Sequence, residues 1–334
     1  MRKEHLQYLV CPTCKVDLTL SAVYQERAGQ IEAGLLACAA CGRTFEVVNA
    51  IPRFVPRENY ASSFGLEWTT HGKTQYDSYT GTDISESRFF NETRWPRDLS
   101  GQVILEVGSG SGRFTEQAVK TGAMVVSFDY SYAVEANFAS NGHHANLLLV
   151  QADVYQMPFR EQVFDKVVCI GVLQHTPDPR RALLTLPSYL KSGGSLVVDI
   201  HRKDTGFPGA IKEILKTGRR LQYFTKRVPP ERLYRWVKRY INLMWPLSRL
   251  ISRIPVIGRK INYLLLVADY RGKYPLSEPL LKEWAILDTF NVLSPQHFNP
   301  QSVETMRHWF AETGLIQIEV RPGYNGVEGR GVKP

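Results

Sequence analysis

The sequence predicts an α/β protein with a mostly parallel sheet, and three observations carry this prediction. Short apolar runs of strand type recur between residues 103 and 200, with helical patterns between them. The first run leads directly into a glycine-rich turn, which is typical of folds that bind nucleotides. Two cysteine pairs precede this region, and a long basic stretch follows it. We therefore expect an α/β domain with a small N-terminal module and an insert.

Two Cys-x-x-Cys pairs stand near the N-terminus, with 23 residues between them. Each tight turn can present two thiolates, and a hairpin between the pairs would bring all four together, which suits tetrahedral zinc. Neither turn holds a histidine or carboxylate, so the expected site is structural. Four free thiols or a redox pair are the alternatives. The predicted zinc ligands are Cys11, Cys14, Cys38 and Cys41.

The glycine-rich turn follows the apolar run at residues 103–107. Glycines let a backbone approach its ligand closely, although dinucleotide enzymes have similar turns. Glu106 stands two residues before the first glycine, where it would attract a positively charged amino group and repel a pyrophosphate. This acid argues against a dehydrogenase, the main rival on such a fold. The expected binding positions in the turn are Gly108, Ser109, Gly110 and Gly112.

Acidic residues also stand at the ends of the next two predicted strands. The run at 124–128 ends at Asp129, which can accept hydrogen bonds from both hydroxyls of a ribose. The run at 147–153 ends in Asp153, which could bind an adenine amino group. Strands at 164–170 and 194–200 follow, then a helix at 302–313 and a last strand at 316–320.

In this order the motifs resemble those of class I S-adenosylmethionine-dependent methyltransferases. The matching stretches are Leu105-Glu106-Val107-Gly108-Ser109-Gly110-Ser111-Gly112, Asp129-Tyr130-Ser131, Gln151-Ala152-Asp153, Gly171-Val172-Leu173-Gln174-His175 and Leu190-Lys191-Ser192-Gly193-Gly194. The resemblance implies a Rossmann-like, seven-stranded sheet with helices on both faces and S-adenosylmethionine as cofactor. It assigns Glu106 and the glycines to the methionine part, Asp129 to ribose and Asp153 to adenine. Each acid could instead be an ordinary strand-end carboxylate. Tyr130, Val154 and Gly171 complete the predicted cofactor-binding set.

Residues 1–56, with Cys11-Pro12-Thr13-Cys14 and Phe45-Glu46-Val47-Val48-Asn49-Ala50-Ile51-Pro52, resemble the zinc-ribbon family that activates tRNA methyltransferases. The resemblance implies a docking or stabilising module. The segment at 75–81 resembles one that precedes the glycine turn in bacterial methyltransferases and can fold over the cofactor; a packing role is the alternative. The closing region, with Leu287-Asp288-Thr289-Phe290-Asn291-Val292-Leu293-Ser294-Pro295 and Trp309-Phe310-Ala311-Glu312-Thr313-Gly314, resembles bacterial methyltransferases of surface-polysaccharide and natural-product gene clusters.

The insert carries the positive charge of the chain. Residues 201–274 hold 18 Lys and Arg against four Asp and Glu, within a chain of net charge +9. Apolar residues recur at helical spacing between 233 and 247, and Pro246 is expected to kink or end that helix. Three interpretations stay open: an apolar face packed on the domain with a solvated basic face, contact with a membrane or an anionic or lipid-linked substrate, and nucleic-acid binding.

We expect a zinc ribbon at 1–57, a cofactor-binding core at 58–200, a basic helical cap at 201–298, and the last helix and strand of the core at 299–334. The expected activity is O- or N-methylation of a small-molecule, glycan or lipid-linked acceptor. An RNA methyltransferase or a cofactor-binding partner subunit is the alternative. Without a signal peptide or membrane span in the sequence, the expected location is the cytoplasm, including the inner face of the membrane.

His175, after the fourth predicted strand, is the candidate general base, with His201 second. A base is required only if the acceptor is a hydroxyl or amine that must lose a proton. The alternative is that His175 merely lines the cofactor pocket. A nucleophilic cysteine for methylation of a base at C5 is lacking, because Cys169 falls inside an apolar strand and is expected in the core.

Overall fold

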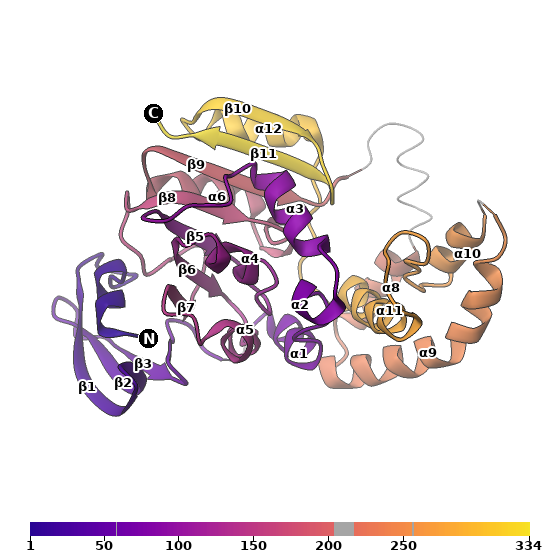
Figure 1. The fold of residues 1–334 in the computed structure, drawn as a ribbon, viewed down its shortest axis with the longest axis horizontal. Coiled ribbons are helices and arrows are strands. Elements are labelled where there is room, and N and C mark those ends of the chain that lie inside the picture. Colours follow the sequence, from indigo (N-terminus) through magenta and orange to yellow (C-terminus); the bar gives the residue numbers. More distant parts are fainter. Residues whose placement is uncertain (58, 204–216, 256) are drawn as a thin grey trace.

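A computed structural model describes residues 1–57, 59–203, 217–255 and 257–334. A small N-terminal sheet, a central sheet and a helical lobe follow one another along the long axis of the molecule (Figure 1). The central sheet has seven strands, and helices pack against it, so the predicted α/β fold class with its N-terminal cysteine cluster and helical insert is confirmed.

The N-terminal part starts with the 3-10 helix η1 (Lys3–Tyr8) and continues as an antiparallel sheet in the order β1-β2-β3-β4. Cys11 and Cys14 precede the β1–β2 hairpin, whereas Cys38 ends β2. The hairpin therefore folds the two cysteine pairs back onto each other. The strands are β1 (Leu18–Arg27), β2 (Gln30–Cys38), β3 (Thr44–Val48) and β4 (Ile51–Pro52).

The central sheet has the order β10-β11-β9-β8-β5-β6-β7. The five strands from β5 to β9 run parallel, and β11 lies antiparallel between β9 and β10. Both of its faces are buried, because Ile104 packs into one hydrophobic cluster and its neighbour Leu105 into another. Its strands are β5 (Val103–Val107), β6 (Met124–Asp129), β7 (Leu147–Gln151), β8 (Phe164–Cys169), β9 (Leu190–Ile200), β10 (Ile316–Pro322) and β11 (Val327–Val332).

The helices of the core follow the strands, as the periodicity predicts. Two of them have side-chain caps: Asp178 accepts from Arg181 N at the start of α6, and Ser302 Oγ accepts from Thr305 N at the start of α12. The core contains α4 (Thr115–Lys120), α5 (Val134–Asn141), η2 (Leu173–His175), α6 (Pro179–Thr185), η3 (Leu186–Tyr189) and α12 (Val303–Ala311).

The sequence predicted one strand after α12, but the structure has two. The missed strand, β11, reads Val-Glu-Gly-Arg-Gly-Val and lacks the apolar run of a buried strand. Its glycines are required by packing, because a Cβ on Gly329 would lie 2.2 Å from Phe310 and one on Gly331 would lie 2.9 Å from Leu315. The side chains that cover β11 thus come from neighbouring elements.

The insert forms a helical lobe with a separate hydrophobic cluster. The longest helix, α9, runs through Pro246, so this proline does not end it. Residues 204–216, which belong to the predicted cap, and Val256 lie outside the described residues. The described helices of the lobe are α8 (Thr217–Thr225), α9 (Pro230–Ile251), α10 (Gly258–Leu264) and α11 (Glu278–Leu293).

The segment before the core joins the lobe to the sheet. Tyr76 donates through its hydroxyl to Ser111 O (2.5 Å), and Trp284 of α11 donates through Nε1 to Thr74 O (2.8 Å). These bonds place the segment between the glycine-rich turn and the lobe. It contains α1 (Ser62–Thr70), α2 (Asp77–Thr80) and α3 (Ile84–Thr93).

Candidate functional site

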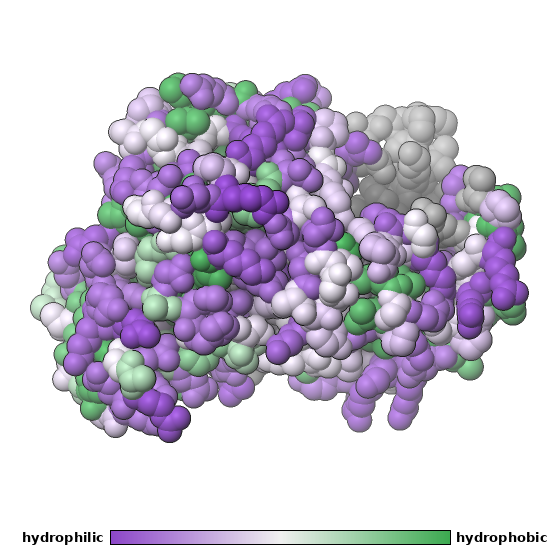
Figure 2. All heavy atoms as spheres, viewed as in Figure 1, coloured by the Kyte–Doolittle hydropathy of each residue, from purple (hydrophilic) through white to green (hydrophobic). Residues whose placement is uncertain are grey.

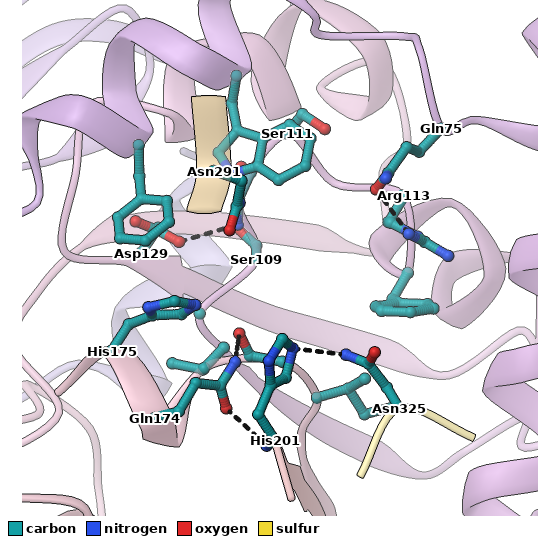
Figure 3. Close-up of a pocket in the computed structure, with 18 of the residues that line it drawn as sticks. Gln75, Ser109, Ser111, Arg113, Asp129, Gln174, His175, His201, Asn291 and Asn325 are labelled. Atoms are coloured by element: carbon teal, nitrogen blue, oxygen red, sulfur yellow. Dashed lines mark hydrogen bonds between the residues drawn. The ribbon is translucent and has the colours of Figure 1, made fainter. Parts of the chain in front are cut away.

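A cavity of about 380 Å³ opens at the carboxyl ends of the central strands. There β5 lies between β6 and β8, so the strand order reverses, which is where open α/β sheets bind their ligands. The cavity walls come from the glycine-rich turn, the segment before the core, the lobe and the β10–β11 turn. In Figure 3, Asp129 and His175 lie on one side of this space, and Gln75 and Arg113 on the other.

The glycine-rich turn forms the floor of the cavity and depends on its glycines. Gly108 and Gly112 have positive φ values of 78° and 96°. A Cβ on Gly108 would lie 2.4 Å from Val172, and one on Gly112 would lie 2.2 Å from Asn137 Oδ1. Side chains are therefore excluded by conformation and by space. The amides of Gly108 and Ser109 donate to Phe128 O (2.8 and 3.0 Å), which fixes the turn to β6.

Glu106 lies behind the turn, buried, and does not line the cavity. Thr115 Oγ1 (2.5 Å) and Ser127 Oγ (2.7 Å) both donate to its Oε2. Burial raises the pKa of Glu106 to about 7, although these two hydrogen bonds oppose the rise. The structure therefore places a carboxyl that titrates near neutral pH next to the methionine-binding positions predicted from the sequence.

The acid after β6 is part of the cavity wall. Asp129 accepts from Gly110 N at Oδ2 and from Ser131 N at Oδ1, both at 2.8 Å. Burial raises its pKa, and these hydrogen bonds lower it. Tyr130 also lines the cavity and stacks on Tyr60, with ring centroids 4.6 Å apart.

The acid after β7 has a different place. Val154 lines the cavity, but Asp153 does not, and Asp153 Oδ1 accepts from Tyr155 N (2.9 Å). Of these two predicted cofactor-binding residues, the structure thus brings Val154 to the cavity, whereas Asp153, the predicted adenine contact, does not line it. Tyr60, Tyr130 and Val154 give this end of the cavity an apolar wall.

His175 lines the cavity on η2 and lies on the same side of it as Asp129 (Figure 3). Its Nδ1 lies 3.2 Å from His297 O, so Nδ1 carries the proton and Nε2 does not. Burial, with His201 nearby, lowers the pKa of His175 to about 3. The ring is therefore neutral at physiological pH and a weak base. His201 also lines the cavity, with Nε2 2.9 Å from Asn325 Nδ2.

Gly171 lies opposite the glycine-rich turn with its backbone open to the cavity. Its φ is +76°, and no atom lies within 4 Å of the place a Cβ would take. Asp199 on β9 accepts from Gly171 N and is itself paired with Arg88 (Oδ2 to Nη2, 2.7 Å). Arg88 also donates to Glu92 (2.6 Å), so a buried ion-pair network ties α3 to β9 and supports Gly171.

Several cavity residues were missed from the sequence, and nearly all lie outside the strand ends. Trp68 comes from the segment before the core, and Lys273 and Asn291 come from the lobe. Gln75 also lines the cavity, and it belongs to the segment 75–81, for which the resemblance implies an ability to fold over the cofactor. Polar and aromatic residues before the core were a visible signal, whereas nothing in the sequence distinguished Lys273 among the basic residues of the insert. Arg113 stands immediately after the glycines and was predicted only as the start of a helix.

The four predicted zinc ligands are brought together in the N-terminal part. Their Sγ atoms all lie within 4.8 Å of one another, and those of Cys11 and Cys41 are 3.8 Å apart. Tetrahedral Zn–S bonds of about 2.3 Å require sulfur atoms about 3.8 Å apart, so the donor set fits one zinc ion. Cys169, the fifth cysteine, is buried in β8, which raises its pKa.

Residues 105–198 match the family model described as a methyltransferase domain. The matched range starts in β5 and ends in β9. The methyltransferase domain thus contains the glycine-rich turn, Asp129, Gly171 and His175, which the geometry gathers around one cavity.

Curated relatives match the same region. The chain is 31% identical over 102 residues to a demethylmenaquinone methyltransferase of Thermobifida fusca, covering 30% of this chain and 43% of the relative. It is 33% identical to a ubiquinone biosynthesis O-methyltransferase of Coxiella burnetii (29% and 43% covered). It is 30% identical to a tRNA U34 carboxymethyltransferase of Campylobacter hominis (33% and 40% covered). The chain spans less than half the length of these relatives, which differ in their acceptors.

Solved structures overlap with more of the chain. The complex of the Haloferax volcanii Trm112 methyltransferase activator with a methyltransferase has a TM-score of 0.43 at 14% identity and covers 84% of this chain and 99% of that chain. An O-methyltransferase family 2 protein of Planctomyces limnophilus in complex with apigenin has a TM-score of 0.44 at 16% identity (82% and 62% covered). Similarities this loose say nothing of substrate or partner.

Proposed function

We propose that the protein transfers a methyl group from S-adenosylmethionine to a small-molecule, glycan or lipid-linked acceptor, by O- or N-methylation. The cavity at the reversal of strand order carries this proposal, because the matched methyltransferase domain supplies its strand-end wall and seven of the ten predicted cofactor residues line it. The four parts expected from the sequence are proposed with it: ribbon, core, cap and the returning end of the core.

The residues around the cavity fit this cofactor. Gly110 and Gly171 present bare backbone, Asp129 offers a carboxylate for the ribose hydroxyls, and Tyr130 and Val154 offer an apolar wall for the adenine. Thr115 and Ser127 occupy only Oε2 of Glu106, which leaves Oε1 for a donor from the cofactor. Gly108 and Ser109 also line the cavity and complete the proposed contacts, whereas Gly112 and Asp153 would act by shaping the turns.

S-adenosylmethionine supplies a methyl group activated by its sulfonium. The protein must align the acceptor and exclude water. Phe64 and Phe298 contact the His175 ring (centroids 4.8 and 5.6 Å away), and Phe64 also lines the cavity beside it. The low pKa of His175, together with its hydrogen bond to His297 O, favours a role in lining and orienting over one in storing a proton. Its role as general base remains a prediction.

The lobe presents a surface that suits an anionic membrane. On α9, Leu233, Val237 and Ile241 are buried against the lobe. A second apolar stripe on the same helix is exposed; it consists of Trp236, Tyr240, Leu243, Leu247 and Leu250. Arg232, Arg235, Lys238, Arg239 and Arg249 lie along the rest of the helix. Hydrophobic and hydrophilic side chains lie next to each other on this lobe (Figure 2).

We propose that this stripe rests on an anionic membrane surface and brings the cap to a lipid-linked acceptor. Among the described residues, no helix is both long and apolar enough to cross a bilayer. The proposed contact with the membrane surface therefore uses only the exposed stripe and the basic residues of α9.

A zinc ion held by the four cysteines is proposed as a structural element of the ribbon.

RNA remains the alternative acceptor, because one relative is a tRNA-modifying enzyme. The cations of the lobe would then bind phosphates. Chemistry at C5 of a base would need a nucleophilic cysteine, and Cys169 is fully buried in β8. A partner subunit without activity of its own would have no need of the cavity described above.

The test is to incubate the purified protein with methyl-labelled S-adenosylmethionine and a fractionated cell extract. We expect label in the lipid or small-glycan fraction. Label in the RNA fraction that is lost on ribonuclease treatment would replace the proposed acceptor with RNA. If no fraction acquires label while the cofactor binds, the chain acts as a partner subunit.

A further inference from the structure

The cavity extends past the predicted cofactor positions to a second end that none of them explains. This end is lined by residues from three separate segments of the chain. Arg113 follows the glycine-rich turn, Lys273 comes from the lobe, and Tyr324 comes from the turn between β10 and β11. It therefore forms only where the lobe meets the core.

Arg113 brings a cation to this end without a carboxylate partner. Its Nη1 donates to Gln75 Oε1 (2.6 Å), as Figure 3 shows. Its Nε is fully buried and makes no hydrogen bond in the described part of the chain. Burial, together with nearby Arg88, lowers the pKa of Arg113 to about 10. Burying a cation without a charge partner costs free energy, and an anion beside the guanidinium would offset this cost.

Lys273 brings a second cation. Its Nζ lies 4.9 Å from the ring centroid of Tyr274, 5.5 Å from that of Tyr270 and 5.8 Å from that of Tyr324. Three aromatic rings thus hold the ammonium group in place. Over the described ranges, Lys273 has no carboxylate within ion-pair distance. The hydroxyls of Tyr274 and Tyr324 are hydrogen-bonded to each other beside it.

The remaining charges at this end do not neutralise these two. Arg88 is already paired with Asp199 and Glu92. Asp288 is the carboxylate that lines this end, and its Oδ2 accepts from the Tyr270 hydroxyl. Burial raises the pKa of Asp288. Asp77 and Asp288 both act electrostatically on Arg113, and Asp288 also acts on Lys273. In the described part of the chain neither cation forms an ion pair with a carboxylate, so an oxyanion at this end would give both of them a direct partner.

We propose that Arg113 and Lys273 form an oxyanion subsite that binds a carboxylate or phosphate group of the methyl acceptor. This inference rests on the proposed function and narrows it: the acceptor is anionic, and its charged group lies at the lobe end of the cavity. A guanidinium presents paired donors and an ammonium a point charge, which together suit an oxyanion with several acceptor oxygens.

The probe is inorganic phosphate, added to the protein saturated with S-adenosylhomocysteine at constant ionic strength. Phosphate is expected to raise the thermal midpoint of the wild-type complex in a saturable way. R113Q, R113K and K273Q are expected to weaken the apparent phosphate affinity at least tenfold, with R113K the least affected. K73Q removes a charge from an exposed lysine outside the cavity and should respond like the wild type. If phosphate raises the thermal midpoints of K73Q and K273Q with equal apparent affinity, Lys273 does not bind the anion and the proposed subsite is wrong.

A second measurement separates the acceptor from the cofactor, whose methionine part also carries a carboxylate. Binding of S-adenosylhomocysteine is compared with that of 5′-methylthioadenosine, which lacks the amino-acid part. We expect R113Q and K273Q to change both affinities less than twofold. If the two variants bind S-adenosylhomocysteine tenfold more weakly and methylthioadenosine as tightly as the wild type does, the two cations bind the cofactor. The inference then fails, whereas the proposed function stands. If the wild type binds neither nucleoside, the proposed function fails first.

Discussion

Glu106 is an acid held out of water directly behind the turn that would hold a cationic cofactor. Its folded-state pKa of about 7 lies above the ordinary value of 4.5. The folded protein therefore takes up a proton between these pH values, and the stability of the cofactor-free protein falls as pH rises from about 4.5 to about 7. A bound cation favours the ionised carboxylate, so it offsets the free-energy cost of ionising Glu106 in the folded protein.

We predict that affinity for S-adenosylhomocysteine, whose amino group is cationic, rises with pH between about 5 and 8 and that E106Q abolishes this rise. At pH 8, E106Q should bind about tenfold more weakly, which corresponds to about 1.4 kcal/mol. Without cofactor, the stability of E106Q should fall less between pH 5.5 and 8 than that of the wild type. Calorimetric titration and urea unfolding at pH 5.5 and 8 measure both effects. A wild-type affinity that is flat with pH would contradict this role.

Two glycines allow backbone strain to be separated from cavity shape. Gly171 and Gly193 have φ values of +76° and +78°, and neither would bring a Cβ within 4 Å of another atom. G171A and G193A should each cost about 1 kcal/mol in the free energy of unfolding, because alanine is strained at such φ values. Only G171A places a methyl group in the cavity, so only G171A should weaken cofactor binding, by at least tenfold. Equal affinities in the two variants would remove Gly171 from the site.

At the scale of elements, α9 carries two apolar stripes, and the lobe buries one of them. Leu243 and Leu250 in the other stripe are 73% and 58% exposed. Burying a leucine side chain is worth about 1.5–3 kcal/mol, so a few such residues can dominate binding to a membrane surface.

We predict that the triple variant L243S/L247S/L250S binds vesicles containing phosphatidylglycerol at least tenfold more weakly than the wild type, with unchanged unfolding. The control is V23S/Y24S, which removes exposed apolar side chains from β1 of the ribbon. Vesicle co-sedimentation measures both. If the control loses as much binding as the triple variant, or the wild type does not bind, α9 is not a membrane surface.

Elements with a strong local pattern could be predicted, and the others could not. The runs Val103–Val107 and Leu147–Gln151 are apolar throughout and mark buried parallel strands. β11 has no such run, because its two glycines are covered by Phe310 and Leu315. In α9 the apolar spacing predicted the helix, and Pro246 was expected to kink or end it, but the packed helix continues through Pro246. In both cases tertiary contacts outweigh local sequence.

For the whole molecule, the ribbon and the core share one hydrophobic cluster. Cys11 and Cys38 belong to the same cluster as Val126 and Phe128 of β6. Backbone bonds reinforce it: Val10 N donates to Pro158 O (2.8 Å), and Phe54 N donates to Gln151 O (2.9 Å). The ribbon therefore acts as part of the core, and its zinc would stabilise both.

We predict one zinc ion per chain by elemental analysis. Removal of zinc with a chelator should lower the thermal midpoint of the whole protein in a single transition, because ribbon and core are packed together. C38S should do the same, whereas C169S, in the core strand β8, should retain the zinc. A separate low-temperature transition with an unchanged main transition would show that the ribbon is independent of the core.

The candidate site could be predicted only in the parts that follow the strands. Gly110 and Asp129 stand at fixed offsets from predicted strands, so their place was visible in the sequence. Arg113 and Lys273 are far apart in the chain and meet because the lobe folds over the core. Their proximity depends on how the lobe packs on the core, and no local pattern in a single sequence predicts that packing.

The central claim is that the cavity at the ends of β5, β6 and β8 binds S-adenosylmethionine. Calorimetric titration with S-adenosylhomocysteine tests it most directly, with D129A and D98A as a matched pair. Each aspartate accepts from the backbone amide two residues ahead, at 2.8 Å for Asp129 and 2.9 Å for Asp98, but only Asp129 lines the cavity. We predict one binding event per chain, weakened at least tenfold by D129A and unchanged by D98A. A wild-type protein that binds no S-adenosylhomocysteine, or a D129A variant that binds it normally, would contradict the claim.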